Sequence, residues 1–231
     1  MKTIAAALLF FTAMTTQAKP VAIVIHAGAG RIDRDSFTPE HERLYHATLE
    51  QSLRAGHAIL KGGGSALDAV EAATVIMEDA PVFNAGKGAV FTAEGKNELD
   101  ASIMDGRALQ AGAVGGVTTV KNPIRAARAV MEKSPHVLFT NRGAEKFAAD
   151  NGLEMVDPKY FFTERRWKQI QTWLKQQEAK AKPRAAAEPD RHADYFSTVG
   201  CVALDAKGNI AASPSTAAVT ATAVTTTTNG A

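Results

Sequence analysis

Cysteine is almost absent from this sequence, which contains only Cys201 in 231 residues. A single cysteine excludes an intramolecular disulfide, and its apolar neighbours indicate a buried, inert thiol rather than a nucleophile. Aromatic residues are also scarce, at 6% of the chain, while glycine and alanine are abundant. This composition favours closely packed layers of helix and sheet over an aromatic-lined binding groove.

The sequence also lacks an excess of charge of either sign. The net charge is +2, so the charge balance does not indicate a nucleic acid or a membrane surface as a partner. The six histidines are scattered and show no metal-binding spacing such as HExxH. We therefore expect no nucleic-acid partner for this chain.

The first eighteen residues have the order of a Sec-type signal peptide. Lys2 supplies the positive region, residues 4–13 the apolar region, and residues 16–18 a small-residue cleavage signal. The segment is too short for a membrane-spanning helix, and a buried N-terminal helix is the alternative. We expect the mature chain to begin near Lys19 and to be periplasmic or secreted, without a membrane partner once the signal is removed.

The N-terminal half predicts a strand followed by two helices. The β-branched run 21–25 is typical of a strand buried on both faces, and it leads into a glycine turn. Thr38 and Pro39 predict the start of a helix, which the glycines at 62–64 end. Ser65 then begins a second helix in a capping-box pattern.

From residue 89 the pattern alternates with a period of two. Residues 89–92 and 98–105 predict a β-hairpin around Gly95, and a glycine-interrupted strand follows at 111–120. Further elements are expected as helices from Asn122, Asn141 and Thr163 and a short strand at 136–139. The fold class is therefore α/β, a layered sheet with helices outside it, without regular βαβα alternation.

The C-terminal part changes composition twice. Residues 175–197 are rich in charge, alanine and proline, which is typical of a linker. Residues 197–213 predict a hairpin that turns at Gly208. Residues 213–231 carry no charge and consist almost entirely of small residues, so we expect a divergent low-complexity tail.

Five collinear stretches lie between Val21 and Ala212, and they read IHAGAG (25–30), GGSALDAVEAA (63–73), FNAGKGAVFTAEGKNELDASIMDG (83–106), AGAVGGVTTVKNPIRAARAVMEKSPHVLF (111–139) and TVGCVALDAKGNIAA (198–212). Together they resemble the plant-type L-asparaginase and isoaspartyl peptidase family of N-terminal-nucleophile hydrolases. A single short motif of this kind is weak, whereas five in order are specific.

The resemblance implies an αββα sandwich made from a precursor that cuts itself between Ser197 and Thr198. It makes residues 19–197 the α-subunit and residues from 198 the start of the β-subunit, and in complete family members two such pairs assemble as a dimer of heterodimers. It makes Thr198 the catalytic nucleophile and matches Thr216 to a second active-site threonine. The implied substrates are small molecules, L-asparagine and β-aspartyl dipeptides.

The chemistry explains why such an enzyme cuts itself. A threonine hydroxyl is a poor nucleophile until an adjacent base takes its proton. A freed α-amine, with an unperturbed pKa of about 8, is such a base and needs no histidine. The structural alternative for Thr198 is an ordinary strand residue, since threonine favours strands.

The resemblance also implies a sodium-binding loop between residues 77 and 87, with a plain loop as the alternative. A hard cation prefers oxygen ligands such as backbone carbonyls. The matching residues are Met77, Glu78, Ala80, Phe83, Ala85 and Lys87. No other cofactor is expected. Asp100 and Asp105 suggest paired acids, but we interpret them as cap and turn residues.

The chain departs from the family pattern at several positions. Ser197 stands where the family has glycine before the nucleophile, Ala217 and Ala218 replace two glycines, and no Arg or Asp follows Lys207. The abrupt change at 213 suggests a frameshift, and we expect the chain as written to be inactive or nearly so. The alternatives are a non-catalytic secreted remnant and a glycosylasparaginase of the same superfamily.

Overall fold

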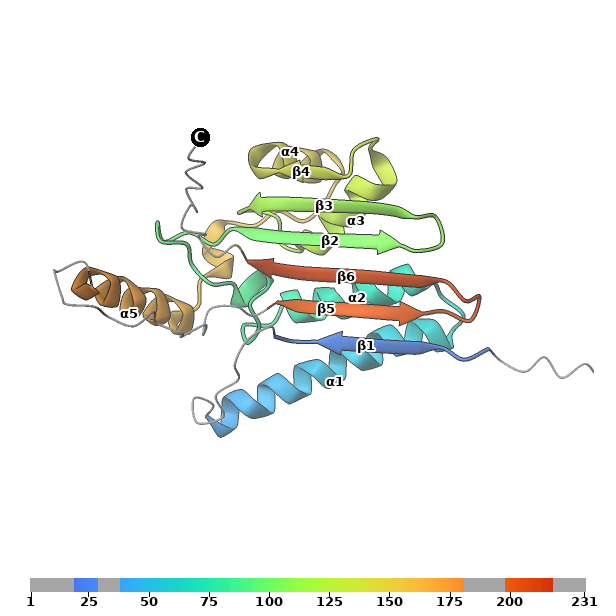
Figure 1. Cartoon of the computed structure of the whole chain (residues 1–231), viewed down its shortest axis with the longest axis horizontal. Coiled ribbons are helices and arrows are strands. Elements are labelled where there is room, and N and C mark those ends of the chain that lie inside the picture. Colours follow the sequence, from blue (N-terminus) through green and yellow to red (C-terminus); the bar gives the residue numbers. More distant parts are fainter. Residues whose placement is uncertain (1–18, 29–37, 181–197, 218–231) are drawn as a thin grey trace, which may run out of the picture.

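Six strands and five α-helices are present in the computed structural model, which describes residues 19–28, 38–180 and 198–217 (Figure 1). The strands are β1 Ala22–His26, β2 Leu99–Asp105, β3 Gln110–Val117, β4 Leu138–Thr140, β5 Val199–Leu204 and β6 Ile210–Ala217. The helices are α1 Pro39–Lys61, α2 Ala66–Glu78, α3 Pro123–Lys133, α4 Asn141–Asp150 and α5 Glu164–Lys180, with 3₁₀ turns η2 Gly86–Gly88 and η3 Pro158–Phe161. The mixed α/β class is confirmed.

All six strands belong to one sheet with the order β1-β5-β6-β2-β3-β4. Neighbouring strands are antiparallel except β3 and β4, which are parallel. The β5–β6 hairpin thus lies inside the sheet, between β1 and β2, although it comes last in the sequence. Figure 1 shows this hairpin flanked by strands from the N-terminal part of the chain.

Helices α1 to α4 contact the strands and pack on one face of this sheet. α2 contacts β5 and β6, and α3 contacts β2 and β3, so that the core lies between these helices and the sheet. Ile103 and Val114 of the sheet and Val70 of α2 are fully buried there. The described residues therefore supply one sheet and one helical layer of the expected sandwich.

The opposite face of the sheet carries exposed apolar side chains. Val24, Val202 and Met104 are 67%, 49% and 43% exposed, and their registers place them in one row across β1, β5, β6 and β2. The expectation that residues 21–25 are buried on both faces is therefore wrong. Among the described residues no helix covers this second face, so β1 buries only alternate side chains.

The predicted starts of the first two helices are confirmed, whereas α4 has Thr140 and not Asn141 as its N-cap. Thr38 Oγ1 accepts a hydrogen bond from the backbone N–H of His41 at 3.2 Å, with Pro39 at the first helical position. Ser65 Oγ accepts from the N–H of Asp68 at 3.1 Å and donates to its carboxylate at 2.7 Å. These bonds satisfy N–H groups that the first turn of a helix leaves without partners.

Residues 89–92 do not form the predicted strand; β2 pairs with β3 and β6 instead. The reason is a side chain that takes the place of a strand partner. Asn97 Nδ2 donates to the carbonyls of Ala89 and Val90, both at 3.0 Å. The N–H of Val90 donates to Asn84 Oδ1 at 2.8 Å. Asparagine amides thus satisfy this segment without a ladder.

Two expected boundaries near the C-terminus differ from the structure. α5 continues to Lys180, past the start of the linker expected at 175. β6 continues through Ala217, past the tail boundary expected at 213. Ser213 and Ser215 are buried against the helical layer, which is the environment of an interior strand. Residues 1–18, 29–37, 181–197 and 218–231, including Ser197 and Ala218, lie outside the described residues.

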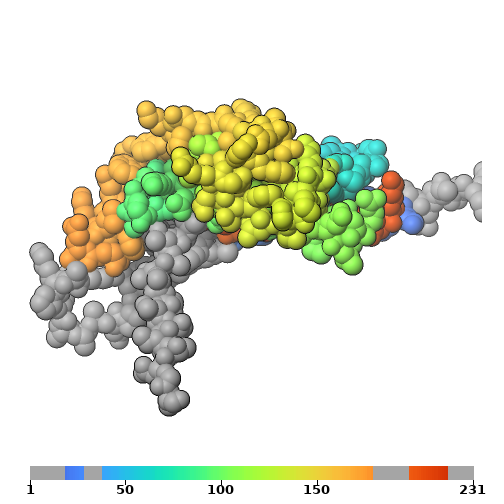
Figure 2. All heavy atoms as spheres, turned by 90° about the horizontal axis from the view of Figure 1, so that it is seen from above, coloured from blue at the N-terminus to red at the C-terminus, as the bar shows by residue number. Residues whose placement is uncertain are grey.

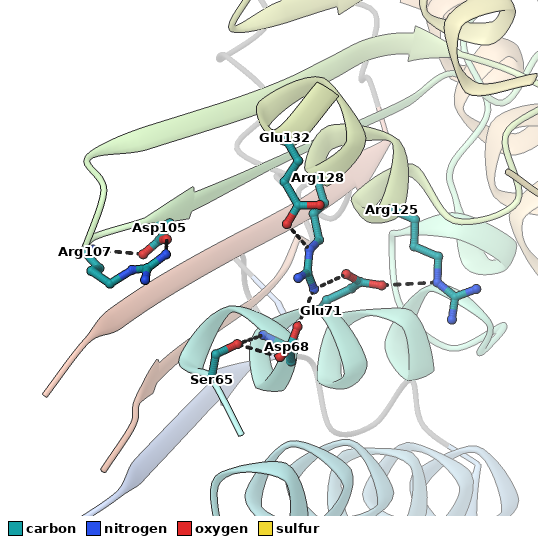
Figure 3. Close-up of polar contacts among 8 residues, drawn as sticks. All are labelled: Ser65, Asp68, Glu71, Asp105, Arg107, Arg125, Arg128 and Glu132. Carbon is teal, nitrogen blue, oxygen red and sulfur yellow. Dashed lines mark hydrogen bonds and ion pairs between the residues drawn. The ribbon is translucent and has the colours of Figure 1, made fainter. Parts of the chain in front are cut away.

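A cluster of charged side chains joins α2 to α3 (Figure 3). Arg128 contacts Asp68 at 2.8 Å, Glu71 at 2.7 Å and Glu132 at 2.8 Å. Burial works to lower the pKa of Arg128, but the three carboxylates raise it above its ordinary value. Arg128 therefore stays charged and joins α2 to α3 through ion pairs.

No helix among the described residues has the length and apolar character of a membrane span.

We predict that Arg128→Ala lowers the free energy of unfolding by about 2 kcal/mol, because it leaves three carboxylates without their shared cation. Arg54→Ala is the matched control, since Arg54 makes a single exposed i,i+4 pair with Glu50, worth about 0.3–0.5 kcal/mol. Urea unfolding of both variants measures the difference. Equal losses in the two variants would contradict the structural role of Arg128.

Candidate functional site

Thr198 and Thr216 lie opposite each other at one end of the sheet. The register pairs Val199 with Ser215, so Thr198, just before β5, faces Thr216 near the end of β6. The hydroxyl of Thr198 donates to the hydroxyl of Thr216 at 3.0 Å. Both residues are partly buried and remain partly accessible. The structure therefore brings together the two threonines that the resemblance singled out, eighteen positions apart in the sequence.

Asp100 is the next residue across the sheet from Thr216. It pairs with Thr216 in the β2–β6 ladder, and its Oδ1 accepts a hydrogen bond from the N–H of Gly116 at 2.8 Å. The β2–β3 register shifts at this point, so a β-bulge aims the Gly116 N–H at the carboxylate. Burial raises the pKa of Asp100, and the Gly116 hydrogen bond opposes that rise.

Asp100 and Asp105 do not form a pair of acids. They stand near opposite ends of β2, about 17 Å apart at 3.4 Å per residue, which exceeds the spacing of a glycosidase pair. Asp105 accepts from the N–H of Arg107 at 2.9 Å, as a turn residue does. The turn interpretation of Asp105 is therefore confirmed, whereas Asp100 holds the bulge beside the threonines.

A buried glutamate supports β6 from the helical side. Ser215 Oγ donates to Glu78 Oε1 at 2.7 Å, and the N–H of Ile124 donates to the same oxygen at 3.0 Å. Glu78 Oε2 has no hydrogen-bond partner in the described part of the chain. Burial raises the pKa of Glu78 to about 8, against the lowering effect of its hydrogen bonds. This carboxyl therefore links the end of α2, the start of α3 and the strand that carries Thr216.

One local feature of the sequence indicates this role of Glu78. Glu78 follows Met77 at the end of α2, and Thr74 lies one helical turn before it. Both Met77 and Thr74 are fully buried. A glutamate at a buried helix position requires a polar partner. Ser215 supplies it from a strand more than a hundred residues away, a contact that local sequence patterns do not reveal.

The loop after α2 folds tightly on itself. A Cβ on Gly86 would collide with the carbonyl of Glu78, and one on Gly88 would collide with the carbonyl of Phe83. The carbonyls of Met77 and Ala85 accept hydrogen bonds from Ala80 and Gly88. The Glu78, Ala80 and Phe83 carbonyls, in contrast, receive no donor from the described residues, and all three residues are buried. The loop thus holds buried carbonyl oxygens behind a glycine framework, while Lys87 lies within η2.

The remaining candidate segment is the IHAGAG stretch. His26 ends β1 and pairs with Gly200 of β5, two residues after Thr198. Ala27 accepts a hydrogen bond at its carbonyl from the hydroxyl of Tyr45 at 3.2 Å, which fixes the chain leaving β1. The last two residues of the motif, 29 and 30, lie outside the described residues. The described part of this motif therefore runs beside the start of β5.

Chemically, this arrangement offers a partly exposed hydroxyl that is already hydrogen-bonded to a second hydroxyl at one end of the sheet. Within the described residues no cluster of three His, Cys, Asp or Glu side chains is placed to hold a metal ion. Cys201 is buried, and burial raises the pKa of its thiol to about 12, so it is a protonated core residue. At this end of the sheet, the hydroxyl of Thr198 is hydrogen-bonded to that of Thr216 and is partly accessible.

Comparison with known proteins gives consistent results. A family model described as Asparaginase matches residues 18–224. The chain is 44% identical over 198 residues to the isoaspartyl peptidase of Escherichia coli (strain K12), covering 86% of this chain and 61% of that protein. It is 44% identical over 202 residues to the isoaspartyl peptidase of Salmonella typhimurium (strain LT2), covering 86% and 63%. It is 42% identical over 200 residues to the isoaspartyl peptidase/L-asparaginase of Homo sapiens, covering 87% and 61%. The chain thus spans about three fifths of the length of these relatives.

Proposed function

The chain belongs to the asparaginase family, whose model matches residues 18–224, and from this we propose that the whole protein is a threonine-nucleophile amidohydrolase. It hydrolyses L-asparagine and β-aspartyl dipeptides and releases aspartate. The names of the relatives support these two substrate classes. The hydrogen bond of 3.0 Å between the hydroxyls of Thr198 and Thr216 is the observation that carries the proposal.

The first step of the proposed mechanism is cleavage of the peptide bond between Ser197 and Thr198. In the uncut chain the nitrogen of Thr198 is an amide and is not basic. Cleavage turns it into an α-amine with an ordinary pKa of about 8, attached to the same residue as the hydroxyl. The amine then takes the hydroxyl proton, while Thr216 keeps the oxygen oriented. Thr198 is thus both nucleophile and carrier of the base.

Amide hydrolysis then proceeds in two halves. The Thr198 oxygen attacks the side-chain carbonyl carbon of the substrate, an ester forms, and ammonia or the following amino acid leaves with a proton. Water, deprotonated by the same amine, then attacks the ester and releases aspartate. The reaction as proposed uses no cofactor. Aspartate release from L-asparagine and from a β-aspartyl dipeptide tests the proposal directly, and the absence of release from either substrate would overturn it.

We propose that the two cleavage fragments remain together. The β5–β6 hairpin, which begins directly after the cleavage point, pairs with β1 on one side and with β2 on the other. Its inward side chains belong to the main core, as Cys201 and Ala211 do. Cleavage before Thr198 breaks neither ladder, so the fragments form one α/β unit. Two such units assemble as the dimer of heterodimers, which sedimentation of the cleaved whole protein tests.

The loop after α2 is the proposed site of a structural sodium ion. The buried carbonyls of Glu78, Ala80 and Phe83 fit this ion, because they lack donors among the described residues and a hard cation prefers such oxygens. Met77, Ala85 and Lys87 complete the proposed set. The ion compensates the carbonyl dipoles and so fixes the loop between α2 and β2.

Sodium is therefore expected to stabilise the protein. At a concentration about a hundred times its dissociation constant, a ligand adds about 2.7 kcal/mol, which corresponds to a rise in Tm of about 5–10 °C. Differential scanning calorimetry in sodium chloride and in choline chloride of equal ionic strength measures this rise. Gly86→Ala, which closes the loop, is expected to lower Tm and to remove the sodium dependence. The same Tm in both salts would contradict the site.

Residues 1–18 are proposed to direct export to the periplasm or the medium. The support is the order of their charged, apolar and small-residue regions. N-terminal sequencing of the protein recovered from the periplasmic fraction tests this proposal, with Lys19 as the expected first residue. Recovery of the chain in the cytoplasm with residue 1 intact would contradict it.

A further inference from the structure

A cavity of about 490 Å³ lies beside the threonine end of the sheet and has no part in the mechanism above. Three separate segments line it: the loop before β2, the end of β3 with the start of α4, and η3 with the residue after it. Figure 2 shows these segments, green, yellow and orange, next to one another on one side of the molecule. The volume is that of a pocket for a small organic molecule.

One wall of this cavity is apolar and fixed. Phe91 and Phe162 both line it, with ring centroids 5.8 Å apart in an edge-to-face contact. Trp167 packs behind Phe91 with a centroid distance of 5.2 Å. Phe91 is buried, whereas Phe162 is 45% exposed, so the wall presents an aromatic surface to whatever enters. Such a surface favours a flat apolar group.

The rim carries three cations from three different segments, Lys96, Arg142 and Lys159. None of the three makes an ion pair within the described part of the chain, whereas Arg128 and Lys121 do. Cations that converge on one cavity without carboxylate partners are a site for an anionic group. The rim therefore favours a ligand with a negative charge.

The same lining also contains two carboxylates, which limits the charge of the ligand. Glu145 Oε1 accepts from both the N–H and the hydroxyl of Thr118 at 2.7 Å. Burial works to raise the pKa of Glu145, but these hydrogen bonds hold it below its ordinary value, so the group is ionised. Glu98 is the second carboxylate. Three cations against two carboxylates favour a monoanionic carboxylate over a doubly charged phosphate.

The floor of the cavity connects it to the threonine site. Gly116 lines the cavity, and its N–H donates to Asp100, the cross-strand neighbour of Thr216. A Cβ on Gly116 would collide with the side chain of Asn141, so the glycine lets β3 and α4 meet there. Asn141 itself has a φ of 50°, an uncommon conformation of the kind that clusters at functional sites. The floor is therefore shaped by two unusual backbone positions.

We propose that this cavity binds a ligand that carries one carboxylate on an aromatic body. The carboxylate lies among Lys96, Arg142 and Lys159, and the aromatic group lies against Phe91 and Phe162. Such a ligand is either the carboxyl-terminal residue of a longer isoaspartyl peptide or a free aromatic amino acid acting as an effector. The peptide source rests on the proposed function, whereas binding itself is measured without turnover and stands apart from it.

Isothermal titration calorimetry of the full chain tests the proposal with three probes. N-acetyl-L-phenylalanine carries both groups, its amide lacks the charge, and acetate lacks the ring. The first is expected to bind at least about tenfold more tightly than either of the others, and its affinity is expected to fall as salt rises, since the cations are exposed. Equal affinity for the three probes, or no detectable heat with the first, would overturn the proposal.

One double variant and one control variant separate the cavity from the rest of the surface. Arg142→Ala combined with Lys159→Ala is expected to weaken binding of N-acetyl-L-phenylalanine at least about tenfold, while Lys61→Ala, at the exposed end of α1, leaves it unchanged. These are surface changes, and circular dichroism verifies the fold of each variant. Binding that survives the double substitution would contradict the assignment.

Turnover distinguishes the two sources of the ligand. Competitive inhibition of β-aspartyl-peptide hydrolysis by N-acetyl-L-phenylalanine identifies the cavity as a subsite for the peptide end. A change in kcat without competition identifies it as an effector site. Both results support the cavity, and an absence of hydrolysis overturns only the proposed function, because the calorimetric result stands by itself.

Discussion

Replacing Thr198 with alanine is expected to leave the chain uncut and to lower aspartate release by the whole protein by at least about four orders of magnitude. The substitution removes the only atom proposed to attack, both in self-cleavage and in hydrolysis. It costs little stability, because Thr198 lies just outside β5 and its hydroxyl contacts only Thr216 in the described structure. Denaturing gel electrophoresis and a coupled assay of aspartate give the two readouts.

Two neighbouring variants show whether the effect is chemical. Thr198→Ser keeps a hydroxyl and is expected to retain cleavage at a reduced rate. Thr216→Val keeps the shape of the side chain but removes the hydrogen-bond partner of Thr198, and we expect about 10²–10³-fold slower hydrolysis, the range found for loss of one oriented polar group. Cleavage before residue 198 in the Thr198→Ala protein would contradict the assigned nucleophile.

Glu78→Gln is expected to make the protein more stable at pH 8 than the parent, by several kcal/mol. Burial raises the pKa of Glu78 in the folded protein to about 8, from an ordinary value of 4.5. Between these values the unfolded chain loses the proton and the folded chain keeps it. The free energy of unfolding of the parent therefore falls by about 1.4 kcal/mol for each pH unit from 4.5 to about 8.

Glutamine mimics the neutral carboxyl and removes this pH dependence. Its amide oxygen can accept from Ser215 and Ile124 as Glu78 Oε1 does, and its NH₂ group takes the place of the oxygen that has no partner in the described structure. The advantage of the variant is therefore absent below pH 4.5, grows up to about pH 8, and stays at that level at higher pH. Urea unfolding at several pH values across this window measures it.

Glu145 provides a matched control, because its substitution is expected to change the free energy of unfolding in the opposite direction. Hydrogen bonds from Thr118 hold the pKa of Glu145 below its ordinary value, although burial works against them. The ionised form of Glu145 thus adds stability above its unfolded pKa, and this stability is lost as pH falls. Glu145→Gln is expected to destabilise the protein at neutral pH and less so in acid. The same pH profile in both variants would contradict the environment assigned to Glu78.

Local signals in the sequence were sufficient for the beginnings of the early helices. Thr38 and Ser65 bond to N–H groups three residues on, and such contacts are determined within one turn of chain. The hairpin around Gly208 was also predictable, because a glycine between two alternating runs marks a turn; its φ is 87°. These features need no information from distant residues.

Features that depend on partners outside the local run of residues were not predictable in the same way. Residues 89–92 alternate like a strand, yet the side chains of Asn84 and Asn97 satisfy their backbone. The apolar run of β1 resembles a doubly buried strand, yet the described helices lie on one face only. In both cases the structure depends on residues that do not belong to the run whose pattern was interpreted.

The threonine pair illustrates the same division. Thr198 was identified by the resemblance, but its contact with Thr216 depends on the register of β5 and β6, which pairs Val199 with Ser215. A shift of one residue would place Ser215 on the open face and Thr216 in the core. Ser213 and Ser215 fix this register from the helical side through Thr74 and Glu78. These buried hydrogen bonds thus place Thr216 opposite Thr198.

Mass spectrometry of the purified wild-type chain, before and after prolonged incubation at neutral pH, tests the central claim most directly. The proposed mechanism predicts two polypeptides, of which the second begins at Thr198, and one uncut polypeptide for Thr198→Ala treated in parallel. A wild-type chain that stays intact, or a new N-terminus at any other residue, would contradict the assignment of Thr198 as a self-released nucleophile.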